Sequence, residues 1–272
     1  MTARTEYGTI YIFGADMEVR FSRRNNRLYS IKKGGEELLN SPIFPQFWRA
    51  MTDNDRGTHM NVRCGMWKDA GKDSSFSITE VKENGKEVVV KTKFTAHTFP
   101  KETTGEIVYT IGSNGIYVDY SVDIPKGLPE VPQIGLLIDC AQSFYALEYL
   151  GRGPHENYID RNHSADIGLY KTDINNLYVP YLKPQEHGER TDVRSAKLIG
   201  TKHSLTVEAQ KSMELNVCRW NVKELEEAAH GYELTQNDKP FVTVSARQMG
   251  IGGYDSWGAR TLPEYENASG KK

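Results

Sequence analysis

The chain has 272 residues, enough to bury a full core as one large domain or two ordinary ones. Charged residues make up 26% and hydrophobic residues 38%, as in an ordinary soluble globular protein. The formal net charge of -2 gives no overall basic field to hold nucleic acid or an anionic membrane. No apolar run approaches the roughly 20 residues that a membrane span needs.

The N-terminus and the cysteines say little about location. Residues 1–8 are polar and show no signal peptide. The compartment stays open, with the cytoplasm favoured over the periplasm. Cys64, Cys140 and Cys218 are widely separated and lack the spacing of a zinc site, so we expect buried free thiols and no metal.

Alternation of apolar and polar residues with a period of two runs through the chain and predicts antiparallel hairpins. Asn84-Gly85, between two β-rich runs, is the strongest of the hairpin signals. The predicted hairpins join 10–13 to 17–22, 76–81 to 88–94 and 106–111 to 116–124, and another strand starts at 28–31 and turns at 34–35. Further strands are predicted at 134–139, 146–149, 204–209, 213–218 and 241–246, with one short helix at 222–230.

Many strands, close turns and almost no helix predict an all-β fold, a large two-sheet β-sandwich. We favour one sandwich domain over 10–266 rather than two small domains. Residues 1–9 are then an N-terminal extension, and 267–272 are a polar tail.

Three long segments, 44–57, 150–194 and 249–258, are interrupted by few strand signals and are not of low complexity. Long ordered loops in a compact domain are usually functional. In the first, Asp53-Asn54-Asp55 does not meet the calcium-loop pattern. We therefore expect these side chains to bind loop backbone, up to Gly57.

The second segment carries nearly balanced charges, which suit either a network of Arg–carboxylate pairs that fixes loop shape or a carbohydrate or anion site. Composition favours the network of Arg–carboxylate pairs. With the acids of the first segment, the predicted network comprises Asp53, Asp55, Arg152, Glu156, Asp160, Arg161, Arg190 and Asp192.

The third segment holds four glycines and Trp257. A glycine-rich loop leaves a tryptophan unusually available, with a flat apolar face and one N–H donor. That combination suits stacking on a sugar ring. The alternative is a turn with Trp257 packed into the core or into a domain interface.

Catalytic groups are harder to assign. Glycoside hydrolysis needs two carboxylates at a defined separation, and nothing distinguishes an acid from a nucleophile among Glu148, Glu156 and Glu186. His155 and His187, with Glu186, suggest an acid/base group of the aldose-isomerising type. Both histidines lie in segments that a structural role explains better than an acid/base role.

In all three segments the sequence resembles the C-terminal domain of family 2 glycoside hydrolases of the β-galactosidase type, called the small chain when it is a separate subunit. The resemblance extends over about 11–266. The family usually has Pro where Met51 and Ile159 stand and Asp at Tyr254. The matching motifs are Phe47-Trp48-Arg49-Ala50, Thr52-Asp53-Asn54-Asp55-Arg56-Gly57, Gly151-Arg152-Gly153-Pro154-His155-Glu156-Asn157-Tyr158, Asp160-Arg161, Tyr178-Val179-Pro180-Tyr181, Pro184-Gln185-Glu186, Gly188, Arg190-Thr191-Asp192-Val193-Arg194, Gln248-Met249-Gly250-Ile251-Gly252-Gly253 and Asp255-Ser256-Trp257-Gly258.

The resemblance implies the supersandwich fold shared with galactose mutarotases. It places the catalytic glutamates and the magnesium and sodium sites on a TIM-barrel domain that this chain lacks. The expected partners are that barrel, or a large subunit, and a galactoside. Trp257 is expected to line the sugar subsite, with Gly57, Thr58 and His59 as possible entrance residues. The isolated chain is expected to be inactive and to hold no cofactor.

Two other functions stay open. A free-standing aldose epimerase would use His155 and His187, and a stand-alone carbohydrate-binding module would use Trp257. Whether the natural product is a separate subunit or part of a longer enzyme is also open.

Overall fold

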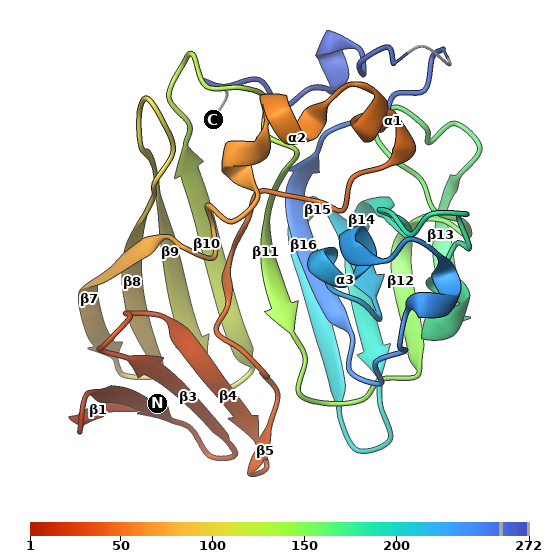
Figure 1. Cartoon of the computed structure of the whole chain (residues 1–272). Helices are drawn as coiled ribbons and strands as arrows, with labels where there is room; N and C mark the ends of the chain where they lie inside the picture. The colour runs from red at the N-terminus through yellow and green to blue at the C-terminus, as the bar shows by residue number, and fades with distance from the viewer. Residues whose placement is uncertain (256–257, 271–272) are drawn as a thin grey trace. The chain divides into compact units, whose positions relative to one another are not determined.

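A computed structural model describes residues 1–255 and 258–270. Within them the strands form three antiparallel sheets of five, four and seven strands (Figure 1), and the predicted all-β class is confirmed. The chain divides into two compact units. Unit 1 comprises Met1–Phe44, Ala70–Leu128 and the chain from Ser269, and unit 2 comprises Pro45–Asp69 and Pro129–Ala268. The single domain expected over 10–266 stays a prediction.

The first sheet of unit 1 follows chain order, β1 to β5. The predicted hairpin with its turn at 14–16 is confirmed, because β2 pairs antiparallel with β3. The expected N-terminal extension contains β1, which pairs with β2 along its whole length. The bounds are β1 (Thr2–Glu6), β2 (Thr9–Phe13), β3 (Met17–Ser22), β4 (Leu28–Lys33) and β5 (Glu36–Glu37).

The second sheet of unit 1 has the order β10-β9-β8-β7, and its two predicted hairpins are confirmed. Its strands are β7 (Ser75–Asn84), β8 (Glu87–Ala96), β9 (Thr103–Gly112) and β10 (Gly115–Asp123). Phe21 of β3 meets Tyr109 of β9 edge to face, with ring centroids 5.2 Å apart. Both rings are buried, so the two sheets of this unit share an apolar interior.

Unit 2 is built on the seven-stranded sheet, in the order β13-β12-β14-β15-β16-β11-β6. Its strands are β6 (Phe44–Gln46), β11 (Gln133–Asp139), β12 (Ala146–Gly153), β13 (Asp166–Asp173), β14 (Arg190–Ile199), β15 (Ser204–Cys218) and β16 (Phe241–Gln248).

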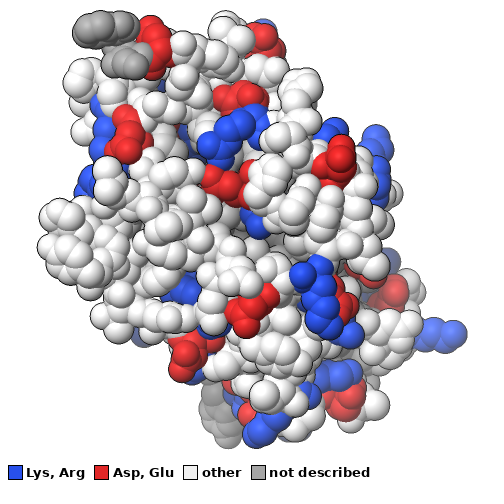
Figure 2. Space-filling view, turned by 90° about the vertical axis from the view of Figure 1, so that its right-hand side faces the viewer, with Lys and Arg blue, Asp and Glu red and all other residues white. Residues whose placement is uncertain are grey.

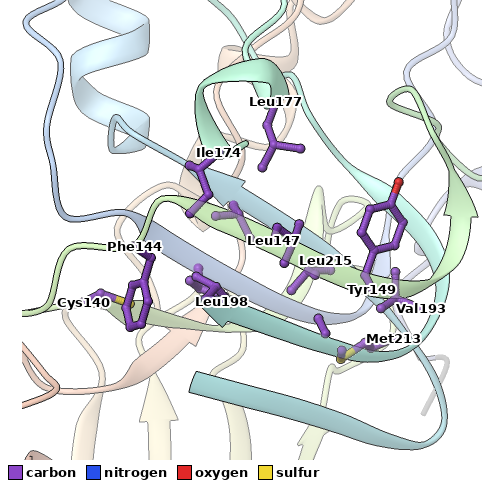
Figure 3. Close-up of a cluster of buried hydrophobic side chains, with 13 residues drawn as sticks. Cys140, Phe144, Leu147, Tyr149, Ile174, Leu177, Val193, Leu198, Met213 and Leu215 are labelled. Atoms are coloured by element: carbon purple, nitrogen blue, oxygen red, sulfur yellow. The ribbon is translucent and has the colours of Figure 1, made fainter. Parts of the chain in front are cut away.

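The two faces of this sheet differ in chemistry, as strand β15 shows. Met213, Leu215 and Val217 belong to the apolar core cluster drawn in Figure 3. Successive side chains of a strand point to opposite faces, so the residues between them, Glu214 and Asn216, lie on the other face. That face is buried but polar.

The helices are short, and only one of them was predicted. The helix expected at 222–230 ends earlier, as α3 (Val222–Glu227). The two missed helices are α1 (Asp53–Gly57) and α2 (Met60–Arg63). Thr52 and Asp55 form a capping box that starts α1 inside a segment expected to be loop. The 3-10 turns are η1 (Gly65–Trp67), η2 (Ile174–Leu177), η3 (Gly231–Glu233) and η4 (Pro263–Tyr265).

Several strand boundaries differ from the prediction. Strand β12 continues to Gly153, and β14 begins at Arg190, both inside the segment expected to be loop. Residues 204–209 and 213–218 form one strand, because β15 stays paired with β14 through register shifts. Strand β13 was not predicted. The three cysteines are free and buried, as expected.

Candidate functional site

Asp160 holds the start of the glycine-rich 249–258 loop. Its carboxylate accepts hydrogen bonds from the backbone N–H of Ile251 at 3.1 Å and of Gly252 at 2.8 Å. The hydroxyl of Thr261 donates to the same carboxylate at 3.2 Å, which closes the far end of the segment. Asp160 was expected to pair with arginines, and the structure instead uses it to shape backbone.

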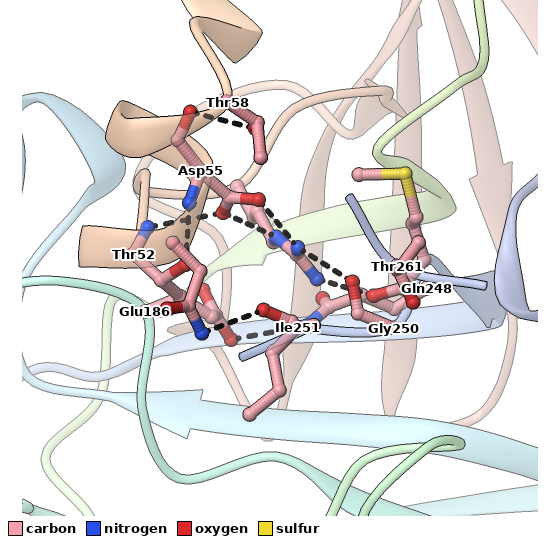
Figure 4. A network of polar contacts seen from close by, with 12 residues as sticks. Thr52, Asp55, Thr58, Glu186, Gln248, Gly250, Ile251 and Thr261 are labelled. Atoms are coloured by element: carbon pink, nitrogen blue, oxygen red, sulfur yellow. Dashed lines mark hydrogen bonds and ion pairs between the residues drawn. The ribbon is translucent and has the colours of Figure 1, made fainter. Parts of the chain in front are cut away.

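Arg49 fixes the same loop from the opposite direction. It is fully buried, and its guanidinium donates to the carbonyl oxygens of Met249 and Gly250. It also forms a two-point ion pair with Asp55 of α1, with N–O distances of 3.0 and 3.2 Å (Figure 4). Arg49 therefore ties α1 to the loop through its planar fork of donors.

Glycines allow the two backbones to meet. A β-carbon built on Gly258 would lie 2.9 Å from the carbonyl oxygen of Gly57, which ends α1. One built on Gly253 would lie 2.8 Å from the side-chain nitrogen of Asn54. Both loop glycines have positive φ, +89° and +91°, a conformation that other residues rarely adopt. We call this assembly, residues 49–59 with 249–261, the loop junction.

The loop junction contains the expected entrance residues. Gly57 contacts the glycine-rich loop directly. Thr58 donates its hydroxyl to the carbonyl of Asp55 at 3.1 Å, and His59 adopts the left-handed conformation between α1 and α2. Trp257, the expected sugar-stacking residue, lies outside the described residues. A hollow of about 250 Å³, its open mouth included, lies at the loop junction between Asn54 and Arg260.

The other predicted charges form separate pairs. Arg152 meets Asp192 at 2.5 Å, and Arg161 meets Glu156 at 2.5 Å. Arg190 donates to carbonyl oxygens and to the hydroxyl of Tyr149. These contacts fix the chain between β12 and β14. In the loop junction, Asp53 pairs with Arg56 at 3.0 Å and accepts from Gln185 at 3.1 Å.

The residues considered for catalysis do not form one group. Glu148 makes a surface ion pair with Lys171 at 2.7 Å, and exposed His155 contacts Ser164. Glu186 and His187 are buried. Burial lowers the pKa of His187, whose Nδ1 lies 2.8 Å from the carbonyl of Gln185, so this nitrogen donates and the ring is neutral.

Sequence reasoning missed a set of buried acids. Glu186, Glu189 and Glu214 are all at least nine-tenths buried. Burial raises the pKa of Glu186 to about 7 and that of Glu214 to about 8, and it raises the pKa of Glu189 well above its usual range. The charge of Arg49 only partly offsets burial. No signal in the sequence marked them: Glu214 occupies a polar position of a regular alternation from Met213 to Val217, which is typical of an exposed face.

Other classes of site are less well supported. Among residues 1–255 and 258–270, no three His, Cys, Asp or Glu side chains are grouped to hold a metal ion. In the same part of the chain, no helix is long and apolar enough to cross a membrane. On the face shown in Figure 2, acidic and basic side chains are interspersed.

Residues 13–271 match the family model described as β-galactosidase small chain. The chain belongs to this family. The β-galactosidase of Priestia megaterium is 33% identical over 259 residues, which cover 94% of this chain and 25% of that protein. The β-galactosidase of Halalkalibacterium halodurans is 34% identical over 263 residues, which cover 94% and 26%. This chain of the β-galactosidase small-chain family thus spans about a quarter of the length of these curated relatives.

A galactose mutarotase-like protein from Lactobacillus casei shares 13% identity with this small-chain family member, at a TM-score of 0.49, with 92% of each chain covered.

Proposed function

We propose that this chain is the non-catalytic small-chain domain of a β-galactosidase and completes a sugar subsite beside a TIM-barrel catalytic domain. One observation carries the proposal: the small-chain match runs over 13–271, while the related β-galactosidases are about four times as long. The bond-breaking groups then belong to the remaining part of such an enzyme.

The loop junction supports a role in positioning. Asp160 and Arg49 hold the backbone of 250–252 on both sides, and Gly258 is seated against Gly57. Backbone that is already held in place loses little entropy when a ligand binds. Trp257 belongs to this loop, and in our proposal its ring stacks on the sugar.

The expected contribution of that stacking is modest. An aromatic contact is worth about 0.5–1.5 kcal/mol beyond its buried area. That corresponds to roughly a few-fold to tenfold in affinity for the sugar on the leaving-group side. The two glutamates of a retaining family 2 mechanism, together with magnesium and sodium, are assigned to the partner barrel in this proposal. We assign no cofactor to this chain.

Activity measurements test the proposal. The purified chain should not hydrolyse a chromogenic β-galactoside. Activity should appear when the chain is combined with the barrel-bearing part of the same enzyme, whether as a second subunit or in one polypeptide. The barrel part alone serves as the control. Robust hydrolysis by the purified chain would refute the proposal.

Within the assembled enzyme, Trp257→Ala should weaken binding of the leaving-group sugar by roughly a few-fold to tenfold. Trp220→Phe is a matched control, because Trp220 is buried in a different cluster of unit 2. Equal effects of the two substitutions on the Michaelis constant would contradict the role given to Trp257.

A further inference from the structure

A second hollow in unit 2 has no role in the proposed function. It lies on the polar face of the seven-stranded sheet and encloses about 450 Å³, open solvent at its mouth included. Its lining includes Gln46, Gln133, Glu186, Asn216, Trp220 and Phe241.

The amide donors around this hollow point into the protein. The Asn216 amide donates to Glu186 Oε1 at 2.8 Å and to the carbonyl of His187 at 2.7 Å. The Gln133 amide donates to Gln248 Oε1 at 2.7 Å. The Gln46 amide donates to the carbonyl of Trp48 at 2.5 Å. Both N–H groups of the Asn216 amide are thus engaged, and the Gln133 and Gln46 amides each use one.

The acceptor oxygens of the same side chains accept no hydrogen bond within the described part of the chain. Within the described part of the chain, no donor reaches Oε1 of Gln46, Oε1 of Gln133, Oδ1 of Asn216 or Oε2 of Glu186. These four side chains belong to residues no more than 9% exposed. None of the four oxygens is among the sealed, unpartnered atoms, so each retains some exposed surface. The lining thus offers unpaired acceptor oxygens, one of them on the Glu186 carboxylate.

The charged groups around the hollow also favour a ligand that is not an anion. Arg49 reaches its wall but is committed to Asp55 and to two carbonyl groups. Glu186 makes no ion pair within the described part of the chain, although the charge of Arg49 partly offsets its burial, and the buried carboxyl of Glu189 lies near enough to repel it. An anion placed here would lie beside the Glu186 carboxyl while Arg49 is already engaged, so the charge does not favour an anionic ligand.

Two aromatic rings complete the lining. The indole N–H of Trp220 donates to the carbonyl of Thr235 at 2.9 Å, so its ring contributes an apolar surface to the hollow and no donor. Phe241 of β16 contributes a second apolar ring. Aromatic faces attract cations, most strongly where water is displaced.

We propose that this hollow binds a small organic ammonium ion, a protonated primary amine, with the Glu186 carboxylate as its counter-ion. An ammonium group has three donors and no acceptor, which complements the surplus oxygens. A neutral polyol would form no ion pair with Glu186. A bare metal ion would leave much of the hollow and its aromatic walls unused.

Two ligands that differ at one position test the proposal. The probe is 2-amino-1,3-propanediol, and the matched neutral control is glycerol, which has a hydroxyl in place of the ammonium group. Calorimetric titration of the whole chain at about pH 8 should show the amine binding about tenfold or more tightly than glycerol. Equal binding of the two, or no binding of the amine, would refute the proposal. Potassium chloride binding as tightly as the amine would refute it too.

The counter-ion is tested by Glu186→Gln, which should weaken amine binding by about tenfold. Glu148→Gln, at an exposed ion pair, is the matched control and should leave binding unchanged. A second readout needs no variant. Because burial keeps Glu186 partly protonated near neutral pH, amine binding at about pH 7 should release protons, and the release should shrink as the pH rises toward about 8. Binding without proton release at the lower pH would overturn the assignment.

Discussion

Gly258 sits so closely against Gly57 that its position has no room for a side chain. A β-carbon on Gly258 would come 2.9 Å from the carbonyl oxygen of Gly57, and one on Gly57 would come 3.6 Å from the Cα of Gly258. The end of α1 and the end of the glycine-rich loop are therefore in direct contact. Any change that separates them moves the residues expected to line the sugar subsite.

The first prediction concerns this contact. Gly258→Ala should lower stability by more than the roughly 1–2 kcal/mol of a left-handed backbone, because it also displaces Gly57. Gly34→Ala is the matched control, since Gly34 has φ +57° and open space around its added β-carbon. Urea unfolding of both variants measures the difference. Equal losses of unfolding free energy in the two variants would mean that the contact between Gly57 and Gly258 does not contribute to stability.

The second prediction concerns Asp160, which shapes the loop backbone. Asp160→Asn keeps the side-chain shape but removes the charge and replaces one acceptor oxygen with a donor. Hydrogen bonds to charged groups contribute about 1.5–3 kcal/mol, so we expect a loss in this range. Amide exchange at Ile251 and Gly252 should become faster. Asp119→Asn, on exposed β10, is the control, and unchanged exchange in Asp160→Asn would contradict this role.

The third prediction compares two ion pairs of the loop junction. Arg49→Met leaves Asp55 buried without its cation and should cost about 3–5 kcal/mol. Arg56→Met removes the partner of Asp53, whose side chain is 70% exposed, and should cost at most about 1 kcal/mol. Chemical unfolding of the two single variants measures the contrast. Similar losses in both would show that burial does not set the strength of the Arg49 pair.

The fourth prediction is a pH dependence of stability. Glu186, Glu189 and Glu214 have folded-state pKa values raised by burial, to about 7 and about 8 for the first and third. Above pH of about 4.5, an unfolded chain has lost these protons while the folded chain retains them. The free energy of unfolding should therefore fall as the pH rises toward about 8, by about 1.4 kcal/mol per pH unit for each such carboxyl.

A variant isolates the contribution of one acid. Glu214→Gln should make the decline of unfolding free energy with pH less steep, because one proton no longer dissociates. Glu208→Gln, exposed on the same strand β15, should leave the slope unchanged. The measurement is urea unfolding at several pH values between about 5 and 8.5. Identical slopes in the two variants would show that Glu214 does not titrate in this window.

The hairpins of unit 1 could be predicted because their signals are local. Asn84-Gly85 specifies the turn between β7 and β8, and period-two alternation specifies which side chains are buried. Strand β13 was missed because its alternation is weak: Ile167 and Leu169 are exposed at the sheet edge. The helix α1 was missed because it is only five residues long, although Thr52 and Asp55 carry its capping pattern.

The sequence indicated which segments form the candidate site, but it did not indicate which residues contact one another there. Composition pointed to the glycine-rich loop and the family resemblance pointed to Gly57, and these two meet in the structure. The anchoring by Asp160 and Arg49 depends on long-range neighbours that no local pattern specifies. Glu189 illustrates the same limit, because it is fully buried although no local pattern in its segment predicts this.

The three cysteines all belong to unit 2, and unit 1 has none. Burial raises the pKa of each thiol to about 12, so a thiol reagent near neutral pH finds little thiolate while the structure is closed. Labelling must then wait for unit 2 to open. The rate at which these native cysteines are labelled, measured by mass spectrometry, therefore reports how often unit 2 opens, and no engineered probe is needed.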